Sequence, residues 1–342
     1  MATRDVPHET PVPPPDPDRL RILEEAGGRL EPLSPLGASL AGIDLRSDRP
    51  EDAVLTALEA EMANRGFIVF KGQQGLTAEQ LVQACQWWGG RALHSTHGVH
   101  PATPGGNRHI FRLSNDQHQG ILGVGPLFHN DGAFCEAPFS HVAYHMVRVP
   151  EHGGGTVFAH LGAAFDALPA ATQARWQRLS SVNATTGVVH PLVHDHPVSG
   201  RRSVWLHLGM TGAVIESSPG GSEHRLLDED ELTALCRDYN ALLSDGIDQG
   251  YTLPYEYEPG DCVFIDNYAV AHKAAGAAHR PAAEQGLRIM HRATIKAPFE
   301  NFAPGHGLPQ VLDIGGPNPF GRGVWKAGGI GFRWDATAPM QN

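Results

Sequence analysis

The sequence predicts a mainly β fold with flanking helices, in which short strands build a sandwich or jelly roll. From residue 109 onward, strand-like runs are separated by glycine-rich turns without a regular alternation of strand and helix, which is typical of such folds. The 40 glycines and 27 prolines also favour a turn-rich fold over a helical bundle. The expected strands in this part are 109–113, 141–149, 156–159, 181–189, 203–208, 252–257, 262–266 and 287–295.

Helices are expected mainly before this β-rich part. In the first of them, Val54, Leu58 and Met62 share one side, which is the pattern of an amphipathic helix. Thr77 opens the second with a capping-box sequence. The expected helices are 51–64, 77–87, 161–179 and 228–243, with a short buried strand at 67–70.

Composition divides the chain into three parts. Residues 1–18 are rich in proline and charge and are expected to form a disordered tail. Residues 19–300 are expected to form a single domain, and residues 301–342 are a glycine- and proline-rich extension. We interpret the extension as a cover over the active site, with a frayed tail as the alternative, because it contains Phe302, Phe320, Trp325, Phe332 and Trp334.

Charge and composition exclude several classes of partner. The net charge of −11 argues against a nucleic-acid groove or an anionic membrane surface. The sequence shows no apolar signal-peptide core and no apolar run of about 18 residues that would span a bilayer. We therefore expect a cytoplasmic protein that binds a small molecule, as a monomer or a homo-oligomer. Its four cysteines lack metal-binding spacing and are expected to be reduced thiols.

The most informative motif is His129-Asn130-Asp131, in a short polar break. In an extended segment, side chains two residues apart point to the same side, so the imidazole and the carboxylate can reach one ion. A further imidazole would complete the two-histidine, one-carboxylate set that binds non-haem Fe(II) and leaves coordination positions open. Alone the motif is weak evidence, because the chain has 20 histidines and 37 acidic residues.

Later features can complete a site around this motif. His272 follows an apolar strand and a polar turn, which would deliver a third ligand, although a hydrogen-bonded loop histidine fits equally well. Arg288 and Arg292 share one face of a strand, about 13 Å apart. They suit two separate anionic groups if that face points inward, and the alternative is an exposed pair on an edge strand. Thr156 either donates to a carboxylate or simply opens a strand.

The stretch from His190 to Pro197 contains three histidines and an aspartate. This composition invites a second metal site. No single side of the stretch collects these side chains, so we interpret it as a strand, a turn and a loop.

Together these residues resemble the taurine dioxygenase family of Fe(II)- and 2-oxoglutarate-dependent oxygenases, which includes the aryloxyalkanoate dioxygenases. The resemblance rests on order and spacing across about residues 35–300. Its elements are His129-x-Asp131, the glycine turn before Thr156, the stretch from His190 to Pro197 with Gly200-Arg201, the strand ending at Asp266-Asn267 with His272 beyond it, and Arg288-Ile-Met-His-Arg292.

The resemblance implies a double-stranded β-helix, the cupin-like jelly roll, as the core. It implies that His129, Asp131 and His272 hold Fe(II), and that Arg288 and Thr156 bind the distal carboxylate of 2-oxoglutarate. The implied reaction consumes O2, hydroxylates an unactivated C–H bond and releases succinate and CO2. Related halogenases lack the carboxylate, so its presence implies oxygen transfer.

The family also indicates the class of substrate. In several members the arginine at the position of Arg292 binds the anionic group of the substrate, so a small carboxylate or sulfonate is expected. Met210 stands where taurine-like members carry an aromatic residue, and its flexible side chain suits a bulkier apolar group than taurine. Further substrate contacts are expected from His97 and His100, which compete with His94 for one position.

Hydroxylation in a biosynthetic or catabolic pathway is the leading hypothesis. The same iron-dependent chemistry giving desaturation, cyclisation or oxidative cleavage is the alternative within the enzyme class. A non-catalytic jelly-roll binding module is the alternative from another class. Retention of the whole set of His129, Asp131, His272 and Arg288 favours the enzyme.

Overall fold

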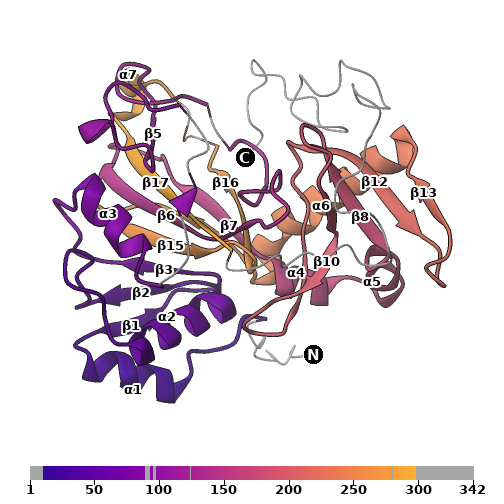
Figure 1. Cartoon of the computed structure of the whole chain (residues 1–342), viewed down its shortest axis with the longest axis horizontal. Coiled ribbons are helices and arrows are strands. Elements are labelled where there is room, and N and C mark those ends of the chain that lie inside the picture. The colour runs from indigo at the N-terminus through magenta and orange to yellow at the C-terminus, as the bar shows by residue number, and fades with distance from the viewer. Residues whose placement is uncertain are drawn as a thin grey trace, which may run out of the picture.

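In the computed structural model, which describes residues 11–88, 93–94, 98–123, 125–276, 278 and 280–297, a large sheet packs against a smaller one (Figure 1). The strands pair mainly antiparallel, with β2 and β3 parallel. In spatial order the large sheet contains β1 (Arg29–Pro32), β2 (Ala38–Ala41), β3 (Phe67–Phe70), β15 (Cys262–Asp266), β6 (Phe139–Arg148), β17 (Ile289–Lys296) and β4 (Leu93–His94), with β5 (Phe111–Ser114) also paired to β17. This is the strand-rich jelly roll with flanking helices that the sequence predicts.

Three smaller sheets complete the β structure of the described residues. The sheet opposite the large one contains β14 (Thr252–Tyr255), β7 (Thr156–His160) and β16 (Val270–Ala274). A further sheet contains β13 (His224–Leu226), β12 (Thr211–Ser217), β8 (Leu179–Asn183) and β9 (Val189–Pro191). A hairpin pairs β10 (Val193–Asp195) with β11 (Arg202–Val204).

Helices cover the molecule on two sides (Figure 1). The first group contains α1 (Pro17–Glu25), α2 (Asp52–Arg65) and α3 (Ala78–Cys85). In this group α1 packs beside β1, α2 beside β3 and β15, and α3 beside β6 and β17. The second contains α4 (Leu161–Ala167), α5 (Ala170–Trp176) and α6 (Glu229–Gln249). In this group α4 packs beside β7 and β11, and α6 beside β7 and β14. Two short elements remain, the 3-10 turn η1 (Pro104–Gly106) and α7 (Ala282–Gln285). No helix within the described residues is long and apolar enough to cross a bilayer.

Alternating side chains let the large sheet serve two cores. In β15, Phe264 packs with the residues of the first helix group, whereas Ile265 packs with those of the smaller sheet. In β17, Ala293 takes the helix side and Met290 the other. Because successive residues of a strand point to opposite faces, β17 presents every second residue to the space between the sheets. The site lies in that space.

The expected disordered tail is too long. Val12 is 1% exposed in the main core, and Arg65 Nη1 donates to Pro13 O at 2.5 Å. Helix α1 begins at Pro17 with Asp16 as its N-cap, a combination that favours helix initiation because proline at the first positions loses no hydrogen bond. Residues 11–18 are therefore part of the folded domain. Residues 1–10 and 301–342, including the extension that we expect to cover the site, lie outside the described residues.

Two expected elements are split. The helix expected at 161–179 becomes α4 and α5, because Leu168 is extended before Pro169, as residues preceding proline tend to be. The strand expected at 181–189 becomes the end of β8 and the start of β9, joined by a turn in which Asn183 Oδ1 accepts hydrogen bonds from Thr185 N and Thr186 N. Six strands were not predicted from the sequence: β1, β2, β4, β12, β13 and β16. The four cysteines are unpaired, as expected.

Candidate active site

Main-chain pairing brings His129 and His272 together. His129 N donates to His272 O and His272 N to His129 O, both at 3.0 Å, and directly paired residues in such a bridge project to the same face. The two ring centroids are 4.3 Å apart. His272 lies within β16, whose pairing with β7 fixes its position. The third ligand expected from the sequence thus stands beside the first.

Asp131 completes a group that can hold a cation. One ligand atom from each of His129, Asp131 and His272 lies within 4.8 Å of the others, and within the described part of the chain this is the only such group of three or more. Asp131 Oδ2 is buried without a hydrogen-bond partner. His129 Nδ1 donates to Leu127 O at 2.8 Å, which leaves the lone pair of Nε2 for a ligand. Two imidazoles and a buried carboxylate with one unpaired oxygen fit a divalent transition metal.

An asparagine cross-link holds the two ligand-bearing segments in register. Asn267 Oδ1 accepts from Asp131 N at 2.9 Å, and Asn267 Nδ2 donates to Asp131 O and Phe139 O, each at 2.8 Å. Asn130 Nδ2 donates to Asn267 O at 2.7 Å and to Val270 O at 2.8 Å. All these contacts are buried, so they fix the main chain on both sides of the candidate metal centre.

Burial and charge set the protonation of the three side chains. Burial lowers the pKa of His129 and lowers that of His272 well below the ordinary value, which keeps both imidazoles neutral. Burial alone would raise the pKa of Asp131, but the charge of Arg292 foremost lowers it to about 2. A neutral imidazole and an ionised carboxylate are the forms that bind metals.

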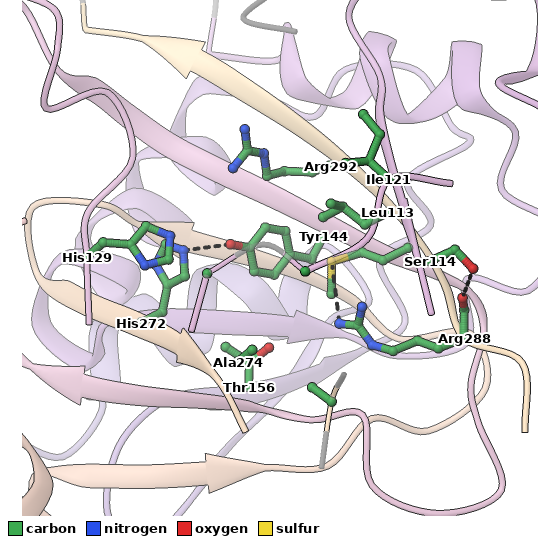
Figure 2. A pocket seen from close by; sticks show the side chains of 14 residues that line it. Leu113, Ser114, Ile121, His129, Tyr144, Thr156, His272, Ala274, Arg288 and Arg292 are labelled. Atoms are coloured by element: carbon green, nitrogen blue, oxygen red, sulfur yellow. Dashed lines mark hydrogen bonds between the residues drawn. The ribbon is translucent and has the colours of Figure 1, made fainter. Parts of the chain in front are cut away.

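Arg288 and Thr156 lie together at the far end of a small cavity next to His272 (Figure 2). Arg288 Nε donates to Gly154 O at 2.8 Å and Nη2 contacts Met290 Sδ at 3.9 Å, and these contacts anchor the guanidinium beside the cavity. Burial lowers the pKa of Arg288. Tyr257 Oη donates to Thr156 Oγ1 at 2.7 Å, so the proton of the Thr156 hydroxyl is left for another acceptor. The glycine turn and the distant strand thus bring a guanidinium and a hydroxyl to one cavity.

Arg292 lines both this cavity and a larger one. Arg288, Met290 and Arg292 all line the small cavity, whereas His291 contacts Arg112 on the opposite face of the strand. The shared inward face predicted for the two arginines is therefore present. The larger cavity has a volume of about 370 Å³. Its lining includes His129, Asp131 and Arg292 beside mostly apolar residues, Phe111, Pro126, Leu127, Phe134, Phe139 and Met210.

Of the other residues expected to contact the substrate, one lies at the larger cavity and one does not. Met210 lines the larger cavity, as expected. His100 lines neither of these cavities: its ring nitrogens contact Gln117 O at 3.1 Å and Ala102 N at 3.1 Å. These hydrogen bonds explain this, because they hold the ring between its own loop and the turn that follows β5. His97 and the side chain of His94 lie outside the described residues.

Sequence reasoning missed two residues of the site. Tyr144, on β6, has its hydroxyl 2.7 Å from His272 Nε2. His207 lines the larger cavity, with its ring centroid 5.2 Å from that of His129, and burial lowers its pKa to about 3. The only sequence signal was a single histidine in the apolar run Trp205-Leu206-His207-Leu208. Tyr144 gave none, because only the register of β6 against β17 places it beside Arg292.

The stretch from His190 to Pro197 forms no second metal group within the described residues. It folds as the end of β9, the strand β10 and a turn, close to the expected strand, turn and loop. His196 Nε2 lies 3.1 Å from Asp266 Oδ1. Asp266 Oδ1 also accepts from Tyr268 N and Ala269 N, so this stretch supports the turn before His272.

Comparison with known proteins agrees with this geometry. The sequence profile described as "Taurine catabolism dioxygenase TauD, TfdA family" matches residues 29–294. The chain belongs to this family of α-ketoglutarate-dependent dioxygenases. α-Ketoglutarate is 2-oxoglutarate, so the family resemblance read from the sequence is confirmed, and the non-catalytic alternative is wrong.

Several curated TauD/TfdA relatives act on different compounds. An alpha-ketoglutarate-dependent sulfate ester dioxygenase of Pseudomonas putida is 26% identical over 266 residues, which cover 70% of this chain and 81% of the relative. Pentalenolactone F synthase of Streptomyces arenae is 25% identical over 302 residues, 75% of this chain and 92% of the relative. The 2,4-dichlorophenoxyacetate dioxygenase of Cupriavidus pinatubonensis is 27% identical over 167 residues, 43% of this chain and 53% of the relative.

Solved structures share the TauD fold. A taurine dioxygenase from Burkholderia xenovorans superposes with a TM-score of 0.62 at 24% identity, covering 79% of this chain and 90% of that one. AAD-2 in complex with Mn(II) and N-oxalylglycine superposes with a TM-score of 0.61 at 22% identity, covering 80% and 99%. The jelly-roll assignment is thereby confirmed.

Proposed function

We propose that this enzyme uses Fe(II), 2-oxoglutarate and O2 to hydroxylate an unactivated C–H bond of a small anionic substrate, releasing succinate and CO2. The observation that carries the proposal is the position of Arg292, a buried cation at the junction of the two cavities and next to a metal-ligating carboxylate. Arg292 Nη1 donates to Asp131 Oδ1 at 2.9 Å, and an anionic group of the substrate in the adjoining cavity would add a second negative charge beside this buried guanidinium. The cavity that it faces is otherwise mostly apolar.

His129, Asp131 and His272 would hold the iron. Bound iron supplies the activation of O2, which no side chain can supply. A donor set of two imidazoles and one carboxylate would leave coordination positions for a chelating cosubstrate and O2. The low pKa of Asp131, about 2, keeps the carboxylate charged at neutral pH.

Arg288 and Thr156 would bind the distal carboxylate of 2-oxoglutarate. The anchored guanidinium of Arg288 offers paired N–H donors, which match a carboxylate in geometry. Thr156 adds a hydroxyl whose orientation is set by Tyr257. This arrangement supports the assignment of the small cavity to the cosubstrate and leaves the larger one for the substrate.

Arg292 would bind the anionic group of the substrate, and the apolar wall would hold its carbon skeleton. Sulfate ester and 2,4-dichlorophenoxyacetate dioxygenases among the relatives have anionic substrates by name, which supports this assignment. Met210 on that wall suits a bulky or irregular apolar group. A carboxylate or sulfonate with an apolar body therefore fits the cavity better than taurine.

Succinate formation from 2-oxoglutarate tests the proposal. The enzyme is incubated with Fe(II), ascorbate and O2 and a panel of aryloxyalkanoates, alkyl sulfates, sulfonates and small carboxylates, with Asp131→Ala as the inactive control. Stimulation by an anionic compound with an apolar body, and not by its neutral ester or alcohol, is the expected result. Stimulation by neutral compounds alone would contradict the role of Arg292. Product mass distinguishes hydroxylation, which adds an oxygen, from desaturation, which removes two hydrogens.

A further inference from the structure

The hydroxyl of Tyr144 contacts the His272 nitrogen that would bind the metal. Its Oη lies 2.7 Å from His272 Nε2 (Figure 2), and that nitrogen is 4.0 Å from Asp131 Oδ2, on the side of the candidate metal centre. His272 Nδ1 is buried without a hydrogen-bond partner. The hydroxyl of Tyr144 and a metal therefore compete for one lone pair of one imidazole.

We propose that Tyr144 is a cosubstrate-binding residue: when the metal takes His272 Nε2, the Tyr144 hydroxyl turns to the metal-proximal end of 2-oxoglutarate and donates a hydrogen bond to it. This inference rests on the proposed function, because it requires 2-oxoglutarate between the metal and Arg288.

Loss of the present acceptor is the first reason. A neutral imidazole has one acceptor nitrogen, and in this structure Tyr144 Oη lies within hydrogen-bond distance of Nε2. Once a metal holds Nε2, the hydroxyl of Tyr144 has no acceptor on His272. Tyr144 is 5% exposed, and a buried hydroxyl left without a partner is strongly unfavourable. The hydroxyl must then find another acceptor within the cavity.

Position is the second reason. Tyr144 pairs with Arg292 across β6 and β17, and its ring lies between His272 and Arg288 (Figure 2). A five-carbon dicarboxylate that reaches from the metal to Arg288 must pass beside this ring. The phenol is therefore next to the half of the cosubstrate that lies nearer the metal.

Elimination of the other hydroxyls is the third reason. Within the described lining, the small cavity has three hydroxyl-bearing residues, Ser114, Tyr144 and Thr156. Ser114 Oγ donates to Arg288 O at 2.7 Å, and Thr156 stands beside Tyr257 at the distal end. Tyr144 is the remaining hydroxyl that can serve the proximal end.

Two binding titrations under anaerobic conditions test the exchange, without turnover. Mn(II) is titrated into metal-free protein, and 2-oxoglutarate is then titrated into the Mn(II)-loaded protein, by calorimetry. Tyr144→Phe removes the competing hydroxyl, so we expect Mn(II) alone to bind equally well or up to about tenfold more tightly. We expect 2-oxoglutarate to bind about tenfold or more weakly, because a hydrogen bond to a charged group is lost.

Tyr251→Phe is the matched control. Tyr251 is 1% exposed, and its Oη donates to Leu242 O at 2.8 Å, away from both cavities. It should change neither dissociation constant by more than about twofold. Unchanged or tighter 2-oxoglutarate binding in Tyr144→Phe, or weaker Mn(II) binding, would overturn the exchange.

A crystal structure of the wild-type protein with Mn(II) and 2-oxoglutarate gives a test that does not depend on the variant folding. Tyr144 Oη is expected within about 3.2 Å of a cosubstrate oxygen, and a longer distance would refute the inference. Failure of the Mn(II)-loaded wild type to bind 2-oxoglutarate at all would instead refute the proposed cosubstrate, and this inference with it.

Discussion

Arg292 Nη1 lies 2.9 Å from Asp131 Oδ1, so the guanidinium assigned to the substrate also contacts the carboxylate assigned to the metal. Both side chains are buried. The other oxygen, Asp131 Oδ2, has no hydrogen-bond partner. Asp131 can therefore bind a metal through Oδ2 while Oδ1 retains the arginine, and the metal and substrate positions are coupled through one carboxylate.

Asp131→Ala should abolish substrate oxidation, because the metal loses its one anionic ligand and Arg292 loses its buried counter-ion. The measurement is succinate formation with the stimulating substrate, together with the Mn(II) stoichiometry of the variant. Asp131→Asn is the matched variant of similar volume, and it should be nearly as inactive. Unchanged turnover in the absence of added halide would rule out Asp131 as a ligand.

Arg292→Ala should raise the Michaelis constant for the primary substrate by about tenfold or more, since a hydrogen bond between charged groups is lost. The Michaelis constant for the cosubstrate should change much less, because Arg288 remains in place. Arg148→Ala, at the exposed end of β6, is the control and should change neither constant. Equal effects of Arg292→Ala on both constants would mean that the two arginines have been assigned wrongly.

Tyr257→Phe should weaken 2-oxoglutarate binding about two- to tenfold. Tyr257 donates to Thr156 Oγ1 and also lies near Arg288. Loss of its hydroxyl frees the threonine hydroxyl to rotate and removes a positioning contact. Calorimetric titration of the Mn(II)-loaded variant measures the change, with Tyr251→Phe as the control. A normal dissociation constant in Tyr257→Phe would show that Thr156 needs no orientation.

Asn267→Ala should lower the free energy of unfolding by about 3 kcal/mol or more, because buried main-chain groups of Asp131 and Phe139 lose their partners. It should also weaken Mn(II) binding, since the cross-link positions Asp131. Asn64→Ala is the control, because the side-chain amide of Asn64 donates to Ala60 O within α2. This substitution should lower the free energy of unfolding by about 1 kcal/mol and should not change Mn(II) binding. Unaltered Mn(II) affinity in Asn267→Ala would show that the cross-link stabilises the fold but does not position Asp131 for the metal.

The local features of the site were predictable from the sequence. Residues whose function depends on spacing within one segment, such as His129 with Asp131 or Arg288 with Arg292, were predictable because strand periodicity fixes which side chains share a face. His272 and Thr156 required the family resemblance, since nothing in their own segments indicates what they face. The family covers residues 29–294, so the resemblance could supply these positions.

Residues that depend on contacts between distant strands were not predictable. Tyr144 joins the site because β6 pairs with β17 in one register, and Asn267 because its turn packs against the segment of Asp131. Strand β1 was missed because only one of its four residues is buried, and β2 because Ala38–Ala41 contains no β-branched or aromatic residue. His100 was expected in the site on its position in the sequence, but its loop hydrogen bonds hold it elsewhere.

Five buried histidines should make the metal-free protein sensitive to mild acid. Burial lowers their pKa values to about 4 or about 3: His145, His160, His190, His194 and His291. In the unfolded chain the pKa of histidine is about 6.5. Below that pH the unfolded state binds protons that the folded state does not, so the free energy of unfolding falls as the pH falls.

Protonation of each of these histidines in the unfolded state should lower the free energy of unfolding by about 1.4 kcal/mol per pH unit. The protein should therefore unfold between about pH 6.5 and pH 4. Urea unfolding in the presence of a chelator at pH 7, 6 and 5 measures the slope. His160→Asn removes one titrating ring but keeps an acceptor for Ala163 N at the start of α4. Its slope should be shallower by about 1.4 kcal/mol per pH unit. A wild-type free energy of unfolding that stays constant from pH 7 to pH 5 would show that these histidines titrate normally in the folded state.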